Sequence, residues 1–251
     1  MRKKSLLLLW VILSSCLVNA ADREQAAVEK VLRDSGLSPR SRPSGEKEGF
    51  ALEVRGTEQR PELATTSCSL RRKGNHSIQG KRFRYEADNR GEWGGQLNVY
   101  GSGPKRAIVG GNVVDLIAIE DDLYVFTGLD HLLSTGGVDV IESYDSNPAS
   151  RHLTETPEAP SVVVLDRNWG GFLIVSSLSV SLVTLHGSLH MIMARHAYLP
   201  NPNSVLTIGR ADILVGVCGG VAWIHAPWRM NRPPDPARAD EIPLVTYWTN
   251  Q

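Results

Sequence analysis

The chain has 251 residues, with 27 lysines and arginines against 27 aspartates and glutamates, and therefore a formal net charge of zero. This balance gives no electrostatic case for a nucleic acid or an anionic membrane surface as partner. The length is a soft indication of one or two domains, and all-β folds of this size often form one.

The first twenty residues have the composition of a secretory signal peptide. Arg2–Lys4 is basic, and the apolar stretch Leu6–Leu13 is shorter than the roughly 20 residues that a membrane-spanning helix needs. Val18–Ala20 then presents residues that a signal peptidase accepts. The sequence therefore predicts a signal peptide over residues 1–20, cleavage after Ala20, and an exported protein that is periplasmic or secreted.

A cysteine inside this leader offers a second route. Leu13–Cys16 resembles the lipobox of bacterial lipoproteins, in which the cysteine is acylated and becomes the first residue of the mature chain. The apolar residues Leu17 and Val18 that follow favour ordinary cleavage after Ala20. Acylation of Cys16 is the alternative, and it predicts a lipid anchor as the only membrane contact.

Two cysteines remain after the leader, Cys68 and Cys218. In the oxidising compartment that an export signal implies, two such cysteines predict a disulfide bond. Closing a loop of about 150 residues contributes up to ~5 kcal/mol through the unfolded state, less any strain in the folded state. Two buried free thiols are the alternative, because sequence alone does not fix the distance between them.

Asp22–Ser35 is predicted to form a short helix. Its apolar residues recur at helical spacing, acidic residues lie in its first turn, and Gly36 follows where a helix ends. Residues 38–49 are polar, charged and interrupted by prolines, which is typical of a flexible linker. We therefore expect a helix and linker over residues 21–49, with the helix either docked on the main domain or spacing it from a membrane.

From Phe50 onward the pattern changes, and residues 50–251 are predicted to form one all-β domain. Apolar and polar residues alternate, and turns at Gly101–Pro104 and His186–Ser188 predict two hairpins. Phe172–Val175 is apolar throughout, which predicts a strand buried on both faces. The expected strands cover residues 50–54, 83–85, 97–100, 107–109, 113–119, 123–126, 138–141, 161–165, 172–175, 182–185, 189–192, 205–208, 213–217, 221–224 and 242–248.

Two phrases of the sequence occur twice. Gly136–Ile141 returns 83 residues later as Gly219–Ile224, and Trp93–Leu97 returns 76 residues later as Trp169–Leu173. Each spacing is close to two units of about 40 residues, the period of four-stranded propeller blades. The repeats predict a β-propeller-like array of about four to five blades, preceded by the short N-terminal helix. A β-sandwich with recurring Gly-Gly turns is the alternative.

The repeats also predict where individual residues lie. Leu123, Leu173 and Ile213 are expected at one equivalent position on an internal strand of successive blades, with Gly-Gly pairs making the turns into strands. Because unpaired strand edges invite aggregation, we expect the terminal strand 242–248 to close the ring by pairing with the first blade.

The tryptophans are candidates for a recognition surface, because aromatic anchors dominate binding hot spots. Trp93 and Trp169 recur in register, which favours a place in the core between blades. For Trp223 and Trp228, both a place in the core and a place on the recognition surface remain alternatives.

Several short phrases occur together in the middle of the chain: Gly91–Gly95, Leu123–Val125 with Gly128–Leu132, Pro157–Ala159, and Pro202–Ser204 leading to Gly219–Ala222. Over residues 91–226 they resemble a group of uncharacterised secreted bacterial proteins with β-propeller-like repeats. The resemblance covers a little over half of the chain and implies propeller-like repeats and secretion. It implies no activity.

Three residues are candidate metal ligands: Asp115, Glu158 and Asn203. Each is expected near the start of the innermost strand of a blade, where side chains ring a central channel and oxygen atoms are suited to calcium. Pro202–Ser204 is similar, with one departure, to the Pro-Asn-Gly phrase of propeller lactonases and related hydrolases. The alternative is that Asn203 and its neighbouring prolines make a turn.

Other candidate chemistry is weaker. His186, His190 and His196 lie close in sequence, but a turn at Gly187 would separate the first two, so we interpret them as solvent-facing polar residues. Glu120–Asp122 is interpreted as a solvated acidic turn. The sequence has neither a Gly-x-Ser-x-Gly nucleophile motif nor a Gly-x-x-x-x-Gly-Lys phosphate loop.

These patterns favour an exported, non-enzymatic β-propeller-like binding protein that needs no cofactor and whose unknown ligand is a protein or a glycan. A periplasmic inhibitor or immunity-type protein is one version of this hypothesis. The alternative is a calcium-dependent hydrolase or lactonase of the propeller type, using Asp115, Glu158 and Asn203. A structural envelope lipoprotein acylated at Cys16 is a third hypothesis.

Overall fold

The computed structural model describes most of the chain after the predicted leader. The described residues are 25–40, 50–57, 60–68, 74–91, 94–129, 135–194, 197–209, 212–225 and 244–250. Several predictions concern residues outside these ranges: the signal peptide 1–20 with Cys16 and Ala20, most of the linker, Trp93, His196 and Trp228. In the part that is described, no helix combines the length and apolar character needed to cross a membrane.

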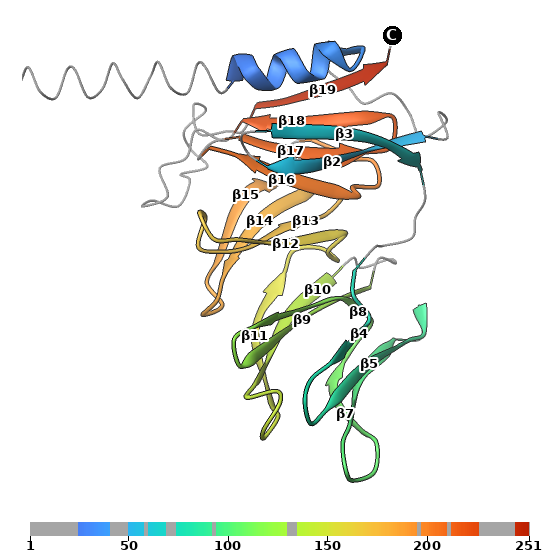
Figure 1. Cartoon of the computed structure of the whole chain (residues 1–251), viewed down its shortest axis with the longest axis vertical. Helices are drawn as coiled ribbons and strands as arrows, with labels where there is room; N and C mark the ends of the chain where they lie inside the picture. The colour runs from blue at the N-terminus through green and yellow to red at the C-terminus, as the bar shows by residue number, and fades with distance from the viewer. Residues whose placement is uncertain are drawn as a thin grey trace, which may run out of the picture.

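The described residues form one helical segment and nineteen strands, so the predicted all-β class is confirmed. In each of four antiparallel sheets, four consecutive strands follow chain order like the blade of a propeller, and one N-terminal strand is added at the edge of the last; a two-stranded hairpin makes a fifth, smaller sheet (Figure 1). The first two sheets contain β4 (Ser77–Gln79), β5 (Arg84–Asn89), β6 (Gly95–Tyr100) and β7 (Arg106–Gly110), then β8 (Val113–Ile119), β9 (Asp122–Leu129), β10 (Thr135–Glu142) and β11 (Ala149–Thr156).

The remaining strands complete the array. The third sheet contains β12 (Val162–Asp166), β13 (Gly171–Val175), β14 (Ser179–Thr184) and β15 (Leu189–Ala194). The last contains β16 (Ser204–Ile208), β17 (Asp212–Val217), β18 (Gly220–His225), β19 (Leu244–Asn250) and β1 (Leu37–Arg40). The hairpin consists of β2 (Phe50–Thr57) and β3 (Arg60–Ser67).

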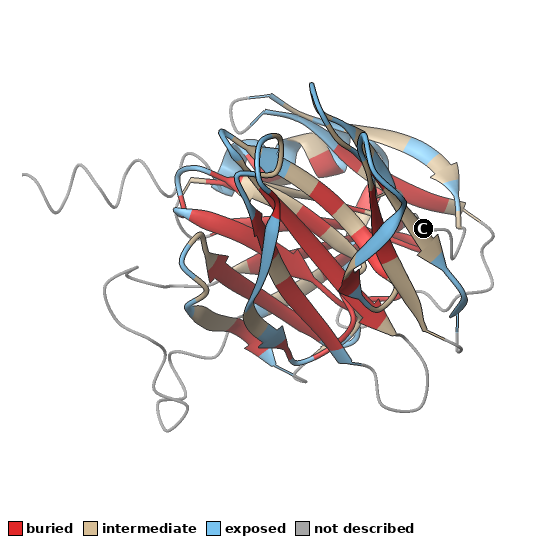
Figure 2. Ribbon diagram, turned by 90° about the horizontal axis from the view of Figure 1, so that it is seen from below, coloured by how far each residue is buried: buried red, intermediate tan, exposed pale blue. Residues whose placement is uncertain are grey.

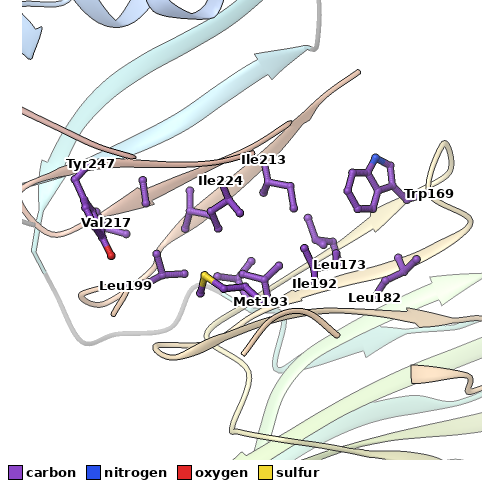
Figure 3. Close-up of a cluster of buried hydrophobic side chains, with 14 residues drawn as sticks. Trp169, Leu173, Leu182, Ile192, Met193, Leu199, Ile213, Val217, Ile224 and Tyr247 are labelled. Carbon is purple, nitrogen blue, oxygen red and sulfur yellow. The ribbon is translucent and has the colours of Figure 1, made fainter. Parts of the chain in front are cut away.

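The sheets stack face to face in a row, with an apolar core between each neighbouring pair (Figure 1). Strand β13 shows the principle, because all five of its residues are buried. Phe172 and Ile174 pack toward sheet β8–β11, whereas Leu173 and Val175 pack toward sheet β16–β19 (Figure 3). The prediction that this strand is buried on both faces is confirmed. Buried residues run along the strands and exposed ones lie mainly at the turns (Figure 2).

One end of the row is capped by the N-terminal segments. Residues 25–34 are helical, in agreement with the predicted helix, and the hairpin β2–β3 lies beside them (Figure 1). Val28 and Leu32 of the helix are buried in a cluster with Trp223 and Trp248 of the last sheet. The helix is therefore docked on the domain, and Trp223 belongs to the core.

Two predictions about the chain ends need correction. Residues 38–40, expected in a flexible linker, belong to β1, which pairs antiparallel with β19 while Leu37 enters the cap cluster. Pro39 is tolerated because β1 is an edge strand. The terminal strand β19 pairs with β18 and β1 instead of the first four-stranded sheet, which lies at the far end of the row (Figure 1).

The repeated phrases follow the sheets in part. Leu123, Leu173 and Ile213 each lie on the second strand of their sheet, as predicted. Gly219 adopts a left-handed conformation (φ 80°) in the turn into β18, as expected, whereas Gly136–Gly137 lies inside β10. The Trp-Gly-Gly phrases are not equivalent, because one leads into the third strand of its sheet and the other into a second strand. Trp169 is buried, as predicted.

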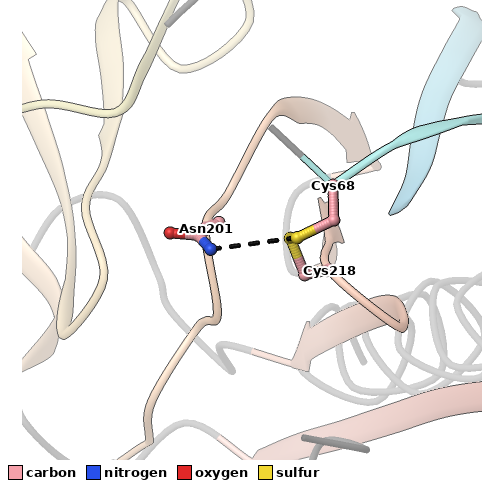
Figure 4. The surroundings of a disulfide bond; sticks show 3 residues. All are labelled: Cys68, Asn201 and Cys218. Atoms are coloured by element: carbon pink, nitrogen blue, oxygen red, sulfur yellow. Dashed lines mark hydrogen bonds between the residues drawn. A yellow bond between two sulfur atoms is a disulfide. The ribbon is translucent and has the colours of Figure 1, made fainter. Parts of the chain in front are cut away.

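The predicted disulfide between Cys68 and Cys218 is present, with 5.3 Å between the two Cα atoms (Figure 4). It joins the end of β3 to the turn between β17 and β18. A bridge pairs Ala51 with Cys218, and the Gly219 amide donates a hydrogen bond to the Phe50 carbonyl (3.0 Å). Covalent and backbone links thus fasten the hairpin to the last sheet.

Candidate functional site

Asp115, the first predicted metal ligand, lies in β8 where the first sheet meets the second. Its Oδ1 atom accepts hydrogen bonds from the backbone amides of Asn75 (2.7 Å) and Leu116 (2.8 Å). Burial raises the pKa of Asp115, although the two amide hydrogen bonds act in the opposite direction. The carboxylate therefore anchors the segment that leads into β4.

Glu158 lies between β11 and β12, and its side chain reaches into the next sheet. It is 8% exposed, and Oε2 accepts hydrogen bonds from the Leu178 amide (2.9 Å) and the Ser179 hydroxyl (3.3 Å). The backbone around it approaches Gly136 so closely that a Cβ atom there would lie 2.8 Å from the Glu158 carbonyl oxygen. Glu158 thus ties the connection between sheets to the β13–β14 turn.

Asn203 precedes β16 and belongs to the junction with the hairpin. Its Oδ1 atom accepts a hydrogen bond from the Ser204 hydroxyl, and Ser204 Oγ in turn accepts one from the Val54 amide (both 2.8 Å). The backbone amide of Asn203 donates a hydrogen bond to the Gly216 carbonyl (2.9 Å). This chain of bonds links β2 to the last sheet.

The three candidate ligands therefore act at three separate junctions of the scaffold. None of the hydrogen bonds that the structure describes for Asp115, Glu158 and Asn203 connects one of them to another. Within the described ranges, no group of three His, Cys, Asp or Glu side chains is arranged to hold a metal ion. Calcium binding by these residues stays a prediction.

Asp115→Asn is expected to change how stability depends on pH. The raised folded-state pKa means that the unfolded chain loses this proton first, so Asp115 lowers the free energy of unfolding as pH rises from 3.8 through its folded pKa. Asparagine keeps the Oδ1 acceptor but does not ionise. The variant should therefore gain stability relative to the wild type between pH 3 and pH 7, measured by urea unfolding at each pH. An unchanged difference between the two proteins across this range would contradict the expectation.

Two histidine clusters were not predicted from the sequence. In the last sheet, Asp212 Oδ1 accepts a hydrogen bond from Trp223 Nε1 (2.7 Å) and lies 2.8 Å from His225 Nδ1. In the second sheet, Asp139 Oδ1 lies 3.2 Å from His152 Nδ1. Burial raises the pKa of Asp139, while the hydrogen bond with His152 lowers it. Each pair joins neighbouring strands, Asp212 to His225 across β17–β18 and Asp139 to His152 across β10–β11.

The far end of the row presents a sheet face of a different kind. Alternate residues of the first sheet, including Tyr85, Leu97 and Val99, enter the core against sheet β8–β11. The residues between them point to the other side, where the row ends (Figure 1). We call this side the open face; it consists of Ser77, Gln79, Arg84, Glu86, Asp88, Gln96, Asn98, Tyr100 and the adjoining Lys105.

The open face is polar and internally organised. The guanidinium of Arg84 lies over the Tyr100 ring, 4.7 Å from its centroid, and the ammonium of Lys105 lies 5.7 Å from the same centroid. Gln96 Nε2 donates a hydrogen bond to Asn98 Oδ1 (2.9 Å), and Asn98 is only 1% exposed. An ordered set of amide, aromatic and cationic groups is suited to binding a polar ligand.

The comparisons with known proteins identify no family. No family model matches the chain, and no curated protein matches it. Among solved structures, a gluconolactonase from Xanthomonas campestris is similar to it with a TM-score of 0.38 and 12% sequence identity. That alignment covers 66% of this chain and 64% of the gluconolactonase.

Proposed function

We propose that the protein is an exported, non-enzymatic binding protein whose open face binds a macromolecule or a glycan. The observation that carries this proposal is the open face itself. It is a polar sheet face whose Arg84, Gln96 and Tyr100 side chains are held by contacts with their neighbours. Side chains that are ordered before binding lose little entropy when a ligand arrives.

The disulfide supports the export part of the proposal. Bonds of this kind persist in oxidising compartments and are rare in the cytosol, and Cys68 and Cys218 are bonded in the folded chain. This agrees with the predicted signal peptide and cleavage after Ala20. Acylation of Cys16 is the alternative, which would tether the same domain to a membrane.

The junction contacts support a rigid scaffold more than a reaction centre. Asp115, Glu158 and Asn203 each accept hydrogen bonds that hold one part of the fold to another. The calcium-dependent hydrolase or lactonase is therefore the less supported alternative. A periplasmic inhibitor or immunity-type protein is one form that the binding protein would take.

The test has a compartment arm and a binding arm. Cell fractionation and intact-mass measurement should find the protein outside the cytoplasm, with a mature N-terminus at Ala21. Purified mature protein should sediment with cell-envelope material. Gln96→Ala/Tyr100→Ala should reduce the bound fraction about tenfold, because the contacts of both side chains with the ligand are lost. Leu178→Ala, an exposed change in another sheet, is the matched control and should bind as the wild type does.

Two results would overturn the proposal. One is equal binding by the wild type and the open-face variant, which would place the binding surface elsewhere. The other is calcium-dependent hydrolysis of a lactone by the wild type that is lost in Asn203→Ala while the fold is retained. The second outcome would favour the hydrolase.

A further inference from the structure

We infer that the ligand of the open face is an acidic polysaccharide, whose carboxylate or sulfate groups are bound by Arg84 and Lys105. This inference rests on the proposed function and specifies its ligand class. The argument depends on where the cations lie, how their charge is balanced, and which groups lie beside them.

The two cations are gathered by one aromatic ring. Arg84 and Tyr100 are directly opposite each other on β5 and β6, and Lys105 follows in the turn after β6. A tyrosine ring attracts cations through its electron-rich face, and this contact holds them without neutralising their charge. Tyr100 therefore keeps two positive groups together at one edge of the open face.

The positive charge exceeds what nearby carboxylates balance. Glu86 lies 3.4 Å from Arg84, and both side chains remain partly exposed, at 41% and 49%. Asp88 on the same face forms an ion pair with Arg90 (2.6 Å) and also attracts Lys105, but among the described residues no carboxylate lies within ion-pair distance of Lys105. Since the whole chain has a net charge of zero, this local excess of cation is a property of the site and not of the protein.

The charge continues along the same end of the sheet. Lys81 and Arg82 lie in the β4–β5 turn, beside the strand that carries Arg84. Asp145, from the β10–β11 loop of the next sheet, also lies at this turn, and its Oδ1 accepts a hydrogen bond from the Arg82 backbone amide (2.7 Å). Hydrogen bonds from backbone amides of this turn lower the pKa of Asp145. The Asp145 carboxylate therefore already accepts hydrogen bonds from the backbone of the turn.

The neighbouring groups favour a saccharide over a lipid surface or a folded protein. Gln96 lies in line with Tyr100 on β6, where its hydrogen bond to the buried Asn98 holds it, and its partly exposed amide group suits sugar hydroxyl groups. An extended polymer chain can lie along the exposed strands of this sheet, edge to edge with their alternating side chains. An acidic glycan would make both a charge-assisted contact with Arg84 and hydrogen bonds with Gln96.

The test uses full-length mature protein and polygalacturonate, with dextran of similar length as the neutral polymer. We expect the wild type to bind polygalacturonate, to bind it more weakly as salt rises, and to leave dextran unbound. Arg84→Gln/Lys105→Gln should weaken binding about tenfold or more, because two contacts to charged groups are lost. Lys30→Gln/Arg151→Gln removes the same net charge from exposed ion pairs elsewhere and should change affinity less than about twofold.

Three results would overturn the inference. They are failure of the wild type to bind polygalacturonate, equal binding of dextran, and an equal loss of affinity in both double variants. Preferential binding to phosphatidylglycerol vesicles over polygalacturonate would also overturn it, in favour of a membrane surface. If the Gln96→Ala/Tyr100→Ala variant still loses envelope binding after any of the first three results, the proposed function stands and only the ligand class is wrong, whereas preferential vesicle binding would overturn both.

Discussion

Removing the Cys68–Cys218 disulfide is expected to lower the free energy of unfolding by about 2–5 kcal/mol. The two cysteines are 150 residues apart in sequence, so the bond removes many conformations from the unfolded chain. In the folded state it also fastens the hairpin over the apolar face of the last sheet. Cys68→Ser/Cys218→Ser should therefore unfold at lower denaturant concentration than the wild type, as followed by tryptophan fluorescence.

The reduced wild type provides the control for this variant. With reductant present, the wild type should unfold at the same denaturant concentration as the double-serine protein, and reductant should leave the variant unchanged. Coinciding curves for oxidised wild type and variant would contradict the expected role of the bond. Hydrogen exchange can locate the region that the bond stabilises. In the variant, the backbone amides of β2 and β3 should lose protection first.

Phe172→Ala is expected to destabilise the protein by about 3–5 kcal/mol. The Phe172 side chain is fully buried between the second and third sheets, with its ring centroid 4.7 Å from that of Tyr124 and 4.9 Å from that of Phe126. Alanine would leave a cavity where two rings lose their partner. Urea unfolding followed by far-ultraviolet circular dichroism measures the change.

A matched apolar truncation shows whether burial is the cause. Leu178 is 36% exposed in the β13–β14 turn of the same sheet, so Leu178→Ala should change stability by no more than about 0.5 kcal/mol. A loss in Phe172→Ala as small as that of the control would mean that the core between these sheets is not close-packed as the structure describes.

The inner strands of each sheet could be predicted from sequence because their side chains meet a core. Strands such as β9 and β17, with nearly every residue buried, read as apolar runs, and the two predicted hairpins are the pairs β6–β7 and β14–β15. Strands β3 and β11 were not predicted. Most of their residues are polar and partly exposed, so their sequences lack the apolar pattern by which a buried strand is recognised.

The candidate site shows a different limit. Residues 97–100 were predicted as one strand of a hairpin from the turn at Gly101–Pro104, and they form part of β6. This pattern gave no indication that the polar side of β6 would be left uncovered by another sheet of the described chain, because that depends on which sheet ends the row. The pairing of Asp212 with His225 was equally hidden, since strand register brings together two residues that are 13 positions apart in sequence.

The last sheet has a consequence for how the chain folds. Leu37 pairs beside Asn250, and both the helix and the hairpin pack on strands that are synthesised near the end of the chain. The surface on which the N-terminal segments pack is therefore absent until almost all of the polypeptide has been synthesised, whereas the three preceding sheets form from hairpins that are local in sequence. Contacts that join such distant residues slow folding. We accordingly expect docking of the N-terminal cap to be the final and slowest step in the assembly of the native protein.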